Sequence, residues 1–121
     1  MKNATLEENW TGKTFNLTDL VKKYGSELVI GRKEEGHERK SAANIFLVEG
    51  DVPGFIRKSI SKEHATIIYN EDERRFYIQD HSKNGTKIND NPLTEITPLE
   101  NGASLYFGKH EYGPVTFHEV I

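Results

Sequence analysis

The chain of 121 residues contains no cysteine and no long apolar run. The absence of cysteine excludes disulfides, thiolate chemistry and cysteine-rich zinc sites. No apolar stretch approaches the roughly 20 residues that a membrane-spanning helix needs, and the first residues do not form a signal-peptide pattern. We therefore expect a protein that acts inside the cell, in the nucleus or the cytoplasm, and does not contact a membrane.

The chain also lacks an excess of basic residues. Its 16 Lys and Arg stand against 19 Asp and Glu, which gives a formal net charge of −3 at pH 7. Domains that bind nucleic acid are usually basic overall, so the negative net charge disfavours a nucleic-acid partner. The length suits one domain with one core over residues 1–121, and one Trp, five Tyr and six Phe provide aromatic side chains for that core.

A sustained apolar period near 3.6 residues, which long helices show, is missing as well. Short runs rich in β-branched and aromatic residues take its place: 28–30, 45–48, 65–69, 76–78, 105–107 and 115–121. In one of these runs Phe76 and Ile78 fall on one face, while Tyr77 and Gln79 fall on the other. Gly, Asn, Asp and Pro separate the runs. The pattern predicts an all-β fold, either an antiparallel sandwich or a barrel.

One short helix near the N-terminus is the most that the pattern allows. Thr18 can cap it, an aspartate follows in the first turn, two lysines stand near its end at Tyr24, and Gly25 comes directly after. Elsewhere two long polar segments, from Arg32 to Ala43 and from Glu49 to Glu63, are poor in strand formers. Loops of this length are uncommon in compact domains and are often functional.

Four short motifs adjoin these loops and turns. They are Gly31-Arg32, then Ser61-Lys62-Glu63-His64, then Asn84-Gly85-Thr86, and last Asn101-Gly102 before an apolar run that ends at Gly108. Each is common by itself, but in this order the four resemble the signature of the forkhead-associated (FHA) family, over roughly residues 27–121. The resemblance implies an antiparallel β-sandwich of about eleven short strands. It also implies a monomeric binding module without enzymatic activity or cofactor, whose loops at one end hold phosphothreonine in an extended peptide.

The resemblance assigns roles to individual residues, and their chemistry suits those roles. A phosphothreonine carries about −1.5 to −2 charge at pH 7 and three strong acceptor oxygens. Arg32 offers a planar fork of donors, Ser61 a hydroxyl, and Lys62 and Lys83 point charges. Asn84 offers amide donors and an acceptor to the peptide backbone. The residues expected to support the site without binding the ligand are Gly31, His64, Gly85, Thr86 and Asn89.

Three alternatives compete with this interpretation. Ser61, His64 and Asp80 could form a hydrolase triad, but the chain has no Gly-x-Ser-x-Gly nucleophile turn. The five histidines show no ligand pair at a spacing suited to a metal, so we expect no metal site. A structural or oligomerising sandwich that no longer reads phosphate is disfavoured, because Arg32 and Ser61 are present together with Asn84.

The sequence does not indicate which protein carries the phosphothreonine. It also leaves the flanking preference open, because Ser59 stands at a position where some relatives carry a basic residue.

Overall fold

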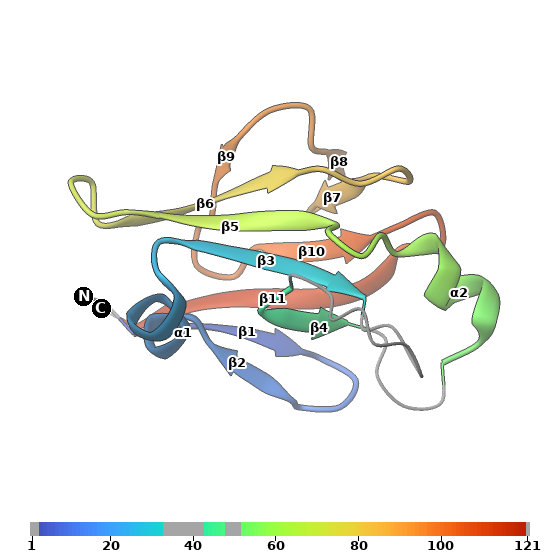
Figure 1. The fold of residues 1–121 in the computed structure, drawn as a ribbon, viewed down its shortest axis with the longest axis horizontal. Coiled ribbons are helices and arrows are strands. Elements are labelled where there is room, and N and C mark those ends of the chain that lie inside the picture. Colours follow the sequence, from blue (N-terminus) through green and yellow to red (C-terminus); the bar gives the residue numbers. More distant parts are fainter. Residues whose placement is uncertain (1–2, 33–42, 48–51, 121) are drawn as a thin grey trace.

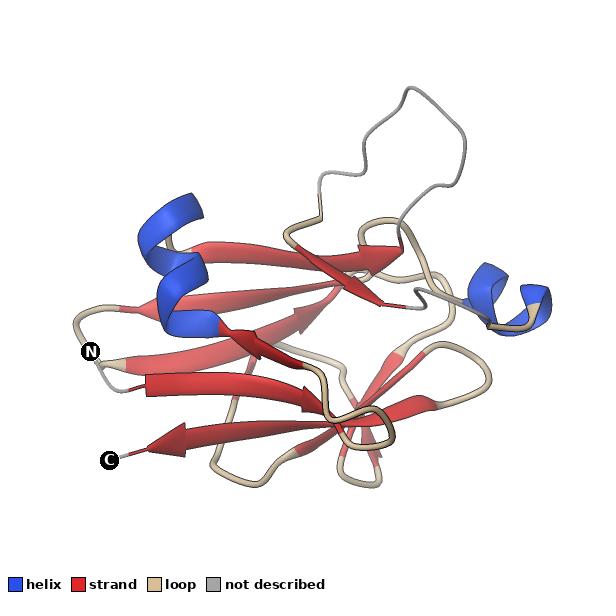
Figure 2. Ribbon diagram, turned by 90° about the horizontal axis from the view of Figure 1, so that it is seen from below, coloured by secondary structure: helices blue, strands red, loops and turns tan. Residues whose placement is uncertain are grey.

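The computed structural model describes residues 3–32, 43–47 and 52–120, and within them two β-sheets face each other (Figures 1 and 2). The six-stranded sheet has the spatial order β2 (Thr14–Asn16), β1 (Asn3–Glu8), β11 (Tyr112–Val120), β10 (Ser104–Phe107), β7 (Thr86–Ile88), β8 (Asn91–Pro92). The five-stranded sheet has the order β4 (Ile45–Leu47), β3 (Glu27–Arg32), β5 (Ala65–Asn70), β6 (Arg75–Asp80), β9 (Thr97–Pro98). Two short helices, α1 (Leu17–Tyr24) and α2 (Gly54–Ser59), accompany them. The prediction of an all-β sandwich of about eleven strands is confirmed.

The core lies between the two sheets and is built from one face of each strand. Phe76 of β6 and Phe117 of β11 come from opposite sheets, and their ring centroids lie 5.8 Å apart. Phe107 of β10 is the third large aromatic residue that is fully buried. The alternation predicted for β6 is confirmed, because Phe76 and Ile78 are buried while Tyr77 and Gln79 are half-buried. Burial of this apolar face is what holds the sheets together.

The predicted N-terminal helix is confirmed, but its cap is not the one expected. α1 begins at Leu17, and Asn16 caps it by accepting a hydrogen bond from the backbone N–H of Asp19 at 3.0 Å. Thr18, which we expected to be the cap, is buried, and its Oγ1 accepts from the backbone N–H of Ala4 at 3.0 Å. Asparagine and threonine are both good cap residues, so local sequence alone does not choose between them.

The expectation of at most one helix is wrong, because α2 forms inside the polar segment from Glu49 to Glu63. Six residues are too few to show a helical apolar period, and such a helix is marginal in isolation. Tertiary contacts hold it instead: Ile60 directly after it is fully buried, and the Nδ2 of Asn84 donates to the carbonyl of Ser59 at 2.9 Å. The other segment expected to be a loop, from Arg32 to Ala43, lies mostly outside the described residues.

One strand pair departs from the expected antiparallel pattern. β3 and β4 run parallel, with Ile30 opposite Ile45. Asn44 secures the start of β4, because its Oδ1 accepts from the backbone N–H of Val29 at 2.8 Å and its own N–H donates to the carbonyl of Val29 at 2.8 Å. Parallel pairing requires a crossover rather than a hairpin, so it cannot be read from turn residues.

Strand pairing brings four connections to one end of the sandwich. β3 ends there at Arg32, and its antiparallel neighbour β5 begins there at Ala65, which pairs with Asp80 at the end of β6. β7 begins at the same end, because the carbonyl of Gly85 directly before it lies 2.8 Å from the Nε2 of His64 directly before β5, and Thr86 pairs with Phe107, the last residue of β10. The helix α2 also lies at this end, whereas α1 and the two chain termini lie at the opposite one (Figures 1 and 2).

Candidate functional site

Arg32 stands at the end of β3, where its side chain is half-buried. Its backbone N–H donates to the carbonyl of Ser61 at 3.2 Å, and its Nη1 donates to the carbonyl of Arg57 at a long 3.4 Å. In the part of the chain that the structure describes, no carboxylate pairs with this guanidinium. Most of its five N–H donors are therefore not used by described residues, so they can serve an anionic ligand.

Ser61 joins the end of β3 to the turn between β6 and β7. Its carbonyl accepts from the N–H of Arg32, and its Oγ accepts from the backbone N–H of Lys83 at 3.2 Å. An oxygen that accepts in this way keeps its hydroxyl hydrogen for donation. The structure thus brings Arg32, Ser61 and Lys83, which are far apart in the sequence, to one place. Lys62 and Lys83 both have exposed side chains beside this point.

His64 is fully buried beneath Ser61 and braces two loops. Its Nδ1 accepts from the backbone N–H of Ser61 at 3.0 Å, and its Nε2 lies 2.8 Å from the carbonyl of Gly85. A carbonyl can only accept, so Nε2 carries the hydrogen and the ring is neutral. Burial is the main reason that the pKa of His64 is lowered from its ordinary value of 6.5; the bond to Gly85 and the charge of Asp80 act in the opposite direction.

The unfolding free energy is expected to fall in acid because of this histidine. Below about pH 6.5 the unfolded chain binds a proton that the folded chain resists, so stability is lost as the pH falls from 6.5 through the lower folded pKa. Protonation would also place a hydrogen on Nδ1 facing the N–H of Ser61. We expect urea titrations between about pH 8 and pH 5 to show a slope of up to about 1.4 kcal/mol per pH unit from this group. His64→Gln should remove that component, and replacing the exposed His81 with glutamine should leave it in place. An unchanged slope in His64→Gln would contradict the assignment.

The turn from Asp80 to Thr86 is shaped by its own side chains. The Oδ1 of Asp80 accepts from the backbone N–H and the Oγ of Ser82, at 3.2 and 2.6 Å, and from the Oγ1 of the buried Thr86 at 2.8 Å. The Oγ of Ser82 accepts in turn from the N–H of Gly85 at 2.7 Å. Gly85 has a φ of 91°, which glycine adopts without strain. These contacts hold Lys83 and Asn84 at the tip of the turn.

Asn84 connects this tip to α2. Its Nδ2 donates to the carbonyl of Ser59 at 2.9 Å, and its side chain is otherwise exposed. Its Oδ1 receives no hydrogen bond from any residue that the structure describes. The amide therefore has one donor hydrogen and one acceptor oxygen with which it can bond the backbone of an extended peptide.

Two glycines allow the backbones to approach closely here. A Cβ on Gly31 would lie 1.7 Å from the carbonyl oxygen of Lys62, and a Cβ on Gly108 would lie 2.8 Å from the carbonyl oxygen of Ser59. Gly31 therefore packs β3 directly against the segment that carries Ser61. Gly31, His64, Gly85 and Thr86, which are predicted to support the site, contact the segments that carry Ser61 and Asn84.

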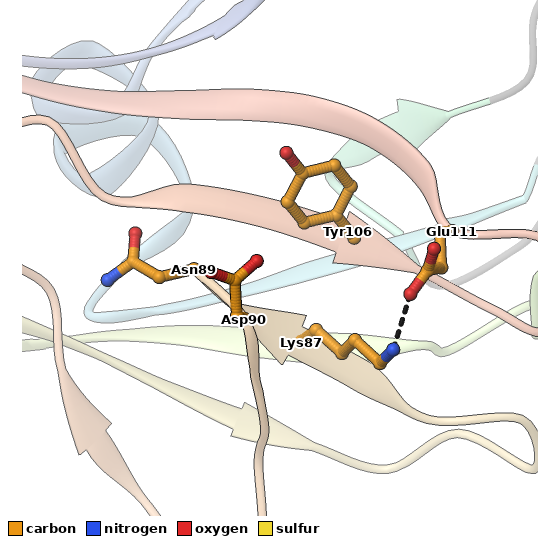
Figure 3. Close-up of a pocket in the computed structure, with 5 residues that line it drawn as sticks. All are labelled: Lys87, Asn89, Asp90, Tyr106 and Glu111. Atoms are coloured by element: carbon orange, nitrogen blue, oxygen red, sulfur yellow. Dashed lines mark hydrogen bonds and ion pairs between the residues drawn. The ribbon is translucent and has the colours of Figure 1, made fainter.

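Asn89 lies away from these contacts. It occupies the turn between β7 and β8 with a φ of 54°, and it braces that turn against β10, where its N–H donates to the carbonyl of Ser104 at 2.7 Å. It also lines a polar hollow of about 190 Å³ (Figure 3). The other residues of that hollow are Lys87, Asp90, Tyr106 and Glu111, and Lys87 is ion-paired with Glu111. None of the residues predicted to bind the ligand lines it.

The geometry does not support a hydrolase triad. The ring of His64 accepts from the backbone N–H of Ser61 and makes no bond to its Oγ. The carboxylate of Asp80 accepts from its own turn. Within the described residues no group of three or more His, Asp or Glu is placed to hold a metal ion. Neither of the described helices is long and apolar enough to cross a membrane.

Four residues that position the site were not among the predicted site residues. Asp80 and Ser82 shape the turn through their hydrogen bond. The carbonyl of Ser59 accepts a hydrogen bond from Asn84, and Gly108 allows the backbone of Ser59 to approach closely. An Asp followed two residues later by Ser is a known signal for a side-chain-closed turn, so the first pair could have been found. The contact of Ser59 with Asn84 has no local signal, because it depends on where α2 packs.

One end of the β-sandwich therefore gathers a half-buried arginine, a serine hydroxyl and an asparagine amide in its clustered loops. The model of the FHA domain family matches residues 28–108, so the chain belongs to the FHA family. A comparison with curated proteins found no match.

Several solved structures share the fold. The FHA domain of the CT664 protein from Chlamydia trachomatis is 22% identical, with a TM-score of 0.64 over 98% of this chain and 97% of that one. The N-terminal FHA domain of Rad53p from S. cerevisiae, solved in complex with a phosphothreonine peptide, is 15% identical, with a TM-score of 0.69 over 98% of this chain and 94% of that one. A domain from work on phosphothreonine-dependent FHA domain interactions is 19% identical, with a TM-score of 0.68 over 98% of both chains.

Proposed function

We propose that this chain binds phosphothreonine-containing peptides and thereby recruits phosphorylated proteins in signalling. Arg32 and Ser61 bind the phosphate, Asn84 binds the peptide backbone, and Lys62 and Lys83 add positive charge beside them. The observation that supports the proposal is that the backbone N–H of Arg32 donates to the carbonyl of Ser61 and the backbone N–H of Lys83 donates to its Oγ, because these bonds make neighbours of residues that carry a guanidinium, a hydroxyl and an ammonium group. Arginine groups recognise phosphorylated motifs in this family. The chain acts as a binding module and not as an enzyme.

Phosphate-dependent binding is the first result to look for. A library of phosphothreonine peptides and its unphosphorylated counterparts would be titrated against the chain by fluorescence polarisation. We expect binding only to phosphorylated members, and a several-fold loss of affinity when salt rises from about 0.1 M to about 0.5 M, because much of the attraction is between charges. Equal binding of both sets would contradict the proposal.

The second candidate is a structural or oligomerising sandwich that keeps the FHA fold and no longer binds phosphorylated residues. It predicts no phosphate-dependent binding together with concentration-dependent association in sedimentation experiments. The half-buried Arg32 supports the first candidate, because within the described residues its guanidinium makes only one long hydrogen bond and no ion pair. Desolvating a charge with so few partners is unfavourable unless a ligand supplies them.

A further inference from the structure

The polar hollow of about 190 Å³ is formed by the six-stranded sheet. Lys87 of β7 lies opposite Tyr106 of β10, and both point away from the core, because the residues on either side of Tyr106 are buried. The hollow therefore opens on the outer face of this sheet. Its lining is completed by Asn89 and Asp90 after β7 and by Glu111 before β11 (Figure 3).

The residues proposed to bind phosphate belong to other elements. Arg32 ends β3 of the five-stranded sheet, and the amide of Asn84 is directed to α2, where it donates to the carbonyl of Ser59. These residues lie in the connections at the end of the sandwich, whereas the hollow opens on one of its faces. An occupant of the hollow therefore does not have to belong to a phosphopeptide.

The size of the hollow limits what can fill it. Sites for whole cofactors and metabolites usually enclose about 300–1,000 Å³. A hollow of about 190 Å³ is smaller than these sites, so it suits a single long side chain better than a nucleotide.

The ring of Tyr106 forms an aromatic wall that is held in place by β11. A Cβ on Gly113 would lie 3.0 Å from the Cδ1 of Tyr106 and 2.4 Å from the carbonyl oxygen of Leu105, so the ring and its strand lie directly against this glycine. Tyr106 is only half-buried there, and it also lines the hollow. The accessible face of a tyrosine ring attracts cations.

The charges of the lining favour the same kind of occupant. Two carboxylates stand against one ammonium group, so the hollow carries an excess of one negative charge. Lys87 is ion-paired with Glu111, and no residue that the structure describes pairs with the carboxylate of Asp90. In the view of Figure 3 the ring of Tyr106 lies between these two carboxylates. An anion would be repelled here, whereas one cation would restore neutrality.

Among biological cations, a guanidinium fits this combination best. It is planar, so it can stack on a ring while its edge donates to a carboxylate, which an ammonium group cannot do. Methylated lysines are recognised by cages of several aromatic rings, and this hollow is lined by one.

We propose that this hollow is an anchor site for an arginine side chain of a partner protein, with the guanidinium stacked on Tyr106 and paired with Asp90. Arginine and tyrosine are both enriched among the residues that contribute most to protein–protein interfaces. The site works without phosphate and gives the domain a second contact surface. It therefore goes beyond the proposed function and does not depend on it.

The test is a titration of the ¹⁵N-labelled chain with N-acetyl-arginine methylamide, followed by NMR. The corresponding citrulline compound has nearly the same shape without the charge, and the lysine compound has the charge without the plane. We expect saturable shifts at the amides of Lys87, Tyr106 and Glu111, with a Kd of roughly 1–20 mM for arginine. Citrulline should bind at least about fivefold more weakly, and lysine should fall between the two.

Three variants locate the binding. Asp90→Asn removes the unpaired carboxylate and should weaken arginine binding at least about fivefold. Tyr106→Leu keeps an apolar side chain beside Gly113 but removes the ring, so it should also weaken binding. Asp72→Asn is the matched control, because it removes an exposed carboxylate at the β5–β6 hairpin, at the opposite end of the sandwich, and should change nothing (Figure 1).

The outcomes separate this site from the phosphate site. Shifts that do not saturate, that are equal for arginine and citrulline, or that persist in Asp90→Asn overturn the anchor site. Tighter binding of lysine than of arginine overturns the assignment to a guanidinium. Asp90→Asn should bind a phosphothreonine peptide within about twofold of the wild type, and a larger loss would contradict the independence of the two sites. The same spectra show whether each variant is folded.

Discussion

Arg32→Ala is expected to weaken phosphothreonine-peptide binding by about 2–4 kcal/mol, which is roughly thirtyfold to a thousandfold in Kd. The guanidinium offers several N–H donors from the end of β3, and within the described residues only the carbonyl of Arg57 accepts from it, at 3.4 Å. Removing it takes away a charge and a planar pair of donors that water cannot replace in the bound state. The unfolding free energy should change by less than about 1 kcal/mol, because the side chain makes little structural contact.

Two further variants make the result specific to this arginine. Arg32→Lys keeps the charge and loses the fork, so it should recover only part of the affinity. Arg75→Ala removes an exposed arginine at the β5–β6 hairpin, where its guanidinium pairs with Glu100 at 3.4 Å, and it should bind like the wild type. Binding of the phosphopeptide that survives Arg32→Ala unchanged would be evidence against the phosphate site. The affinities can be measured by isothermal titration calorimetry.

Gly31→Ala is expected to lower the unfolding free energy by about 3 kcal/mol or more and to abolish phosphopeptide binding. The new Cβ would lie 1.7 Å from the carbonyl oxygen and 2.6 Å from the carbonyl carbon of Lys62, so a backbone segment has to move. That movement would break the hydrogen bond from Arg32 to Ser61. The proposed binding residues would then separate even in molecules that stay folded. Urea unfolding gives the stability, and fluorescence polarisation at 10 °C gives the binding of the folded fraction.

Gly54→Ala is the matched control for this substitution. A Cβ at Gly54 would meet nothing within 4 Å, and alanine favours a helix more than glycine does. Its stability should equal or slightly exceed that of the wild type, with unchanged binding. If Gly31→Ala unfolded within about 0.5 kcal/mol of the wild type, the close approach of β3 to Lys62 would be refuted.

The motif residues and the strands could be predicted because their signals are local. A two-residue alternation such as that of 76–79 identifies a strand, and Asn-Gly identifies a turn through its tolerance of positive φ. The second helix could not be predicted in this way. Its six residues have no period of their own, and buried Ile60 and the contacts of Ser59 are what stabilise it.

The residues that were expected to support the site also differ in whether local sequence predicts their contacts. Gly31 and His64 were expected to support the site, and the structure places both in contact with the segment of Ser61. Asn89 shared the same expectation, but it braces β7 against β10 instead. Its positive φ is a property of its own turn, and the residues of that turn do not indicate which loop packs beside it.

The sequence by itself determined the all-β class and the family, because each follows from residue type, alternation and short spacing, and it also supplied the residues proposed to offer donors to an anion. Only the tertiary structure decided that Ser61 touches both Arg32 and Lys83, that His64 is a neutral brace, and that Asn84 bonds to Ser59 of α2. These contacts join residues more than 20 positions apart in the chain or depend on the placement of a helix with no local signal. They exist because antiparallel pairing of β3, β5 and β6, and packing of the second sheet against them, bring the four connections to one end.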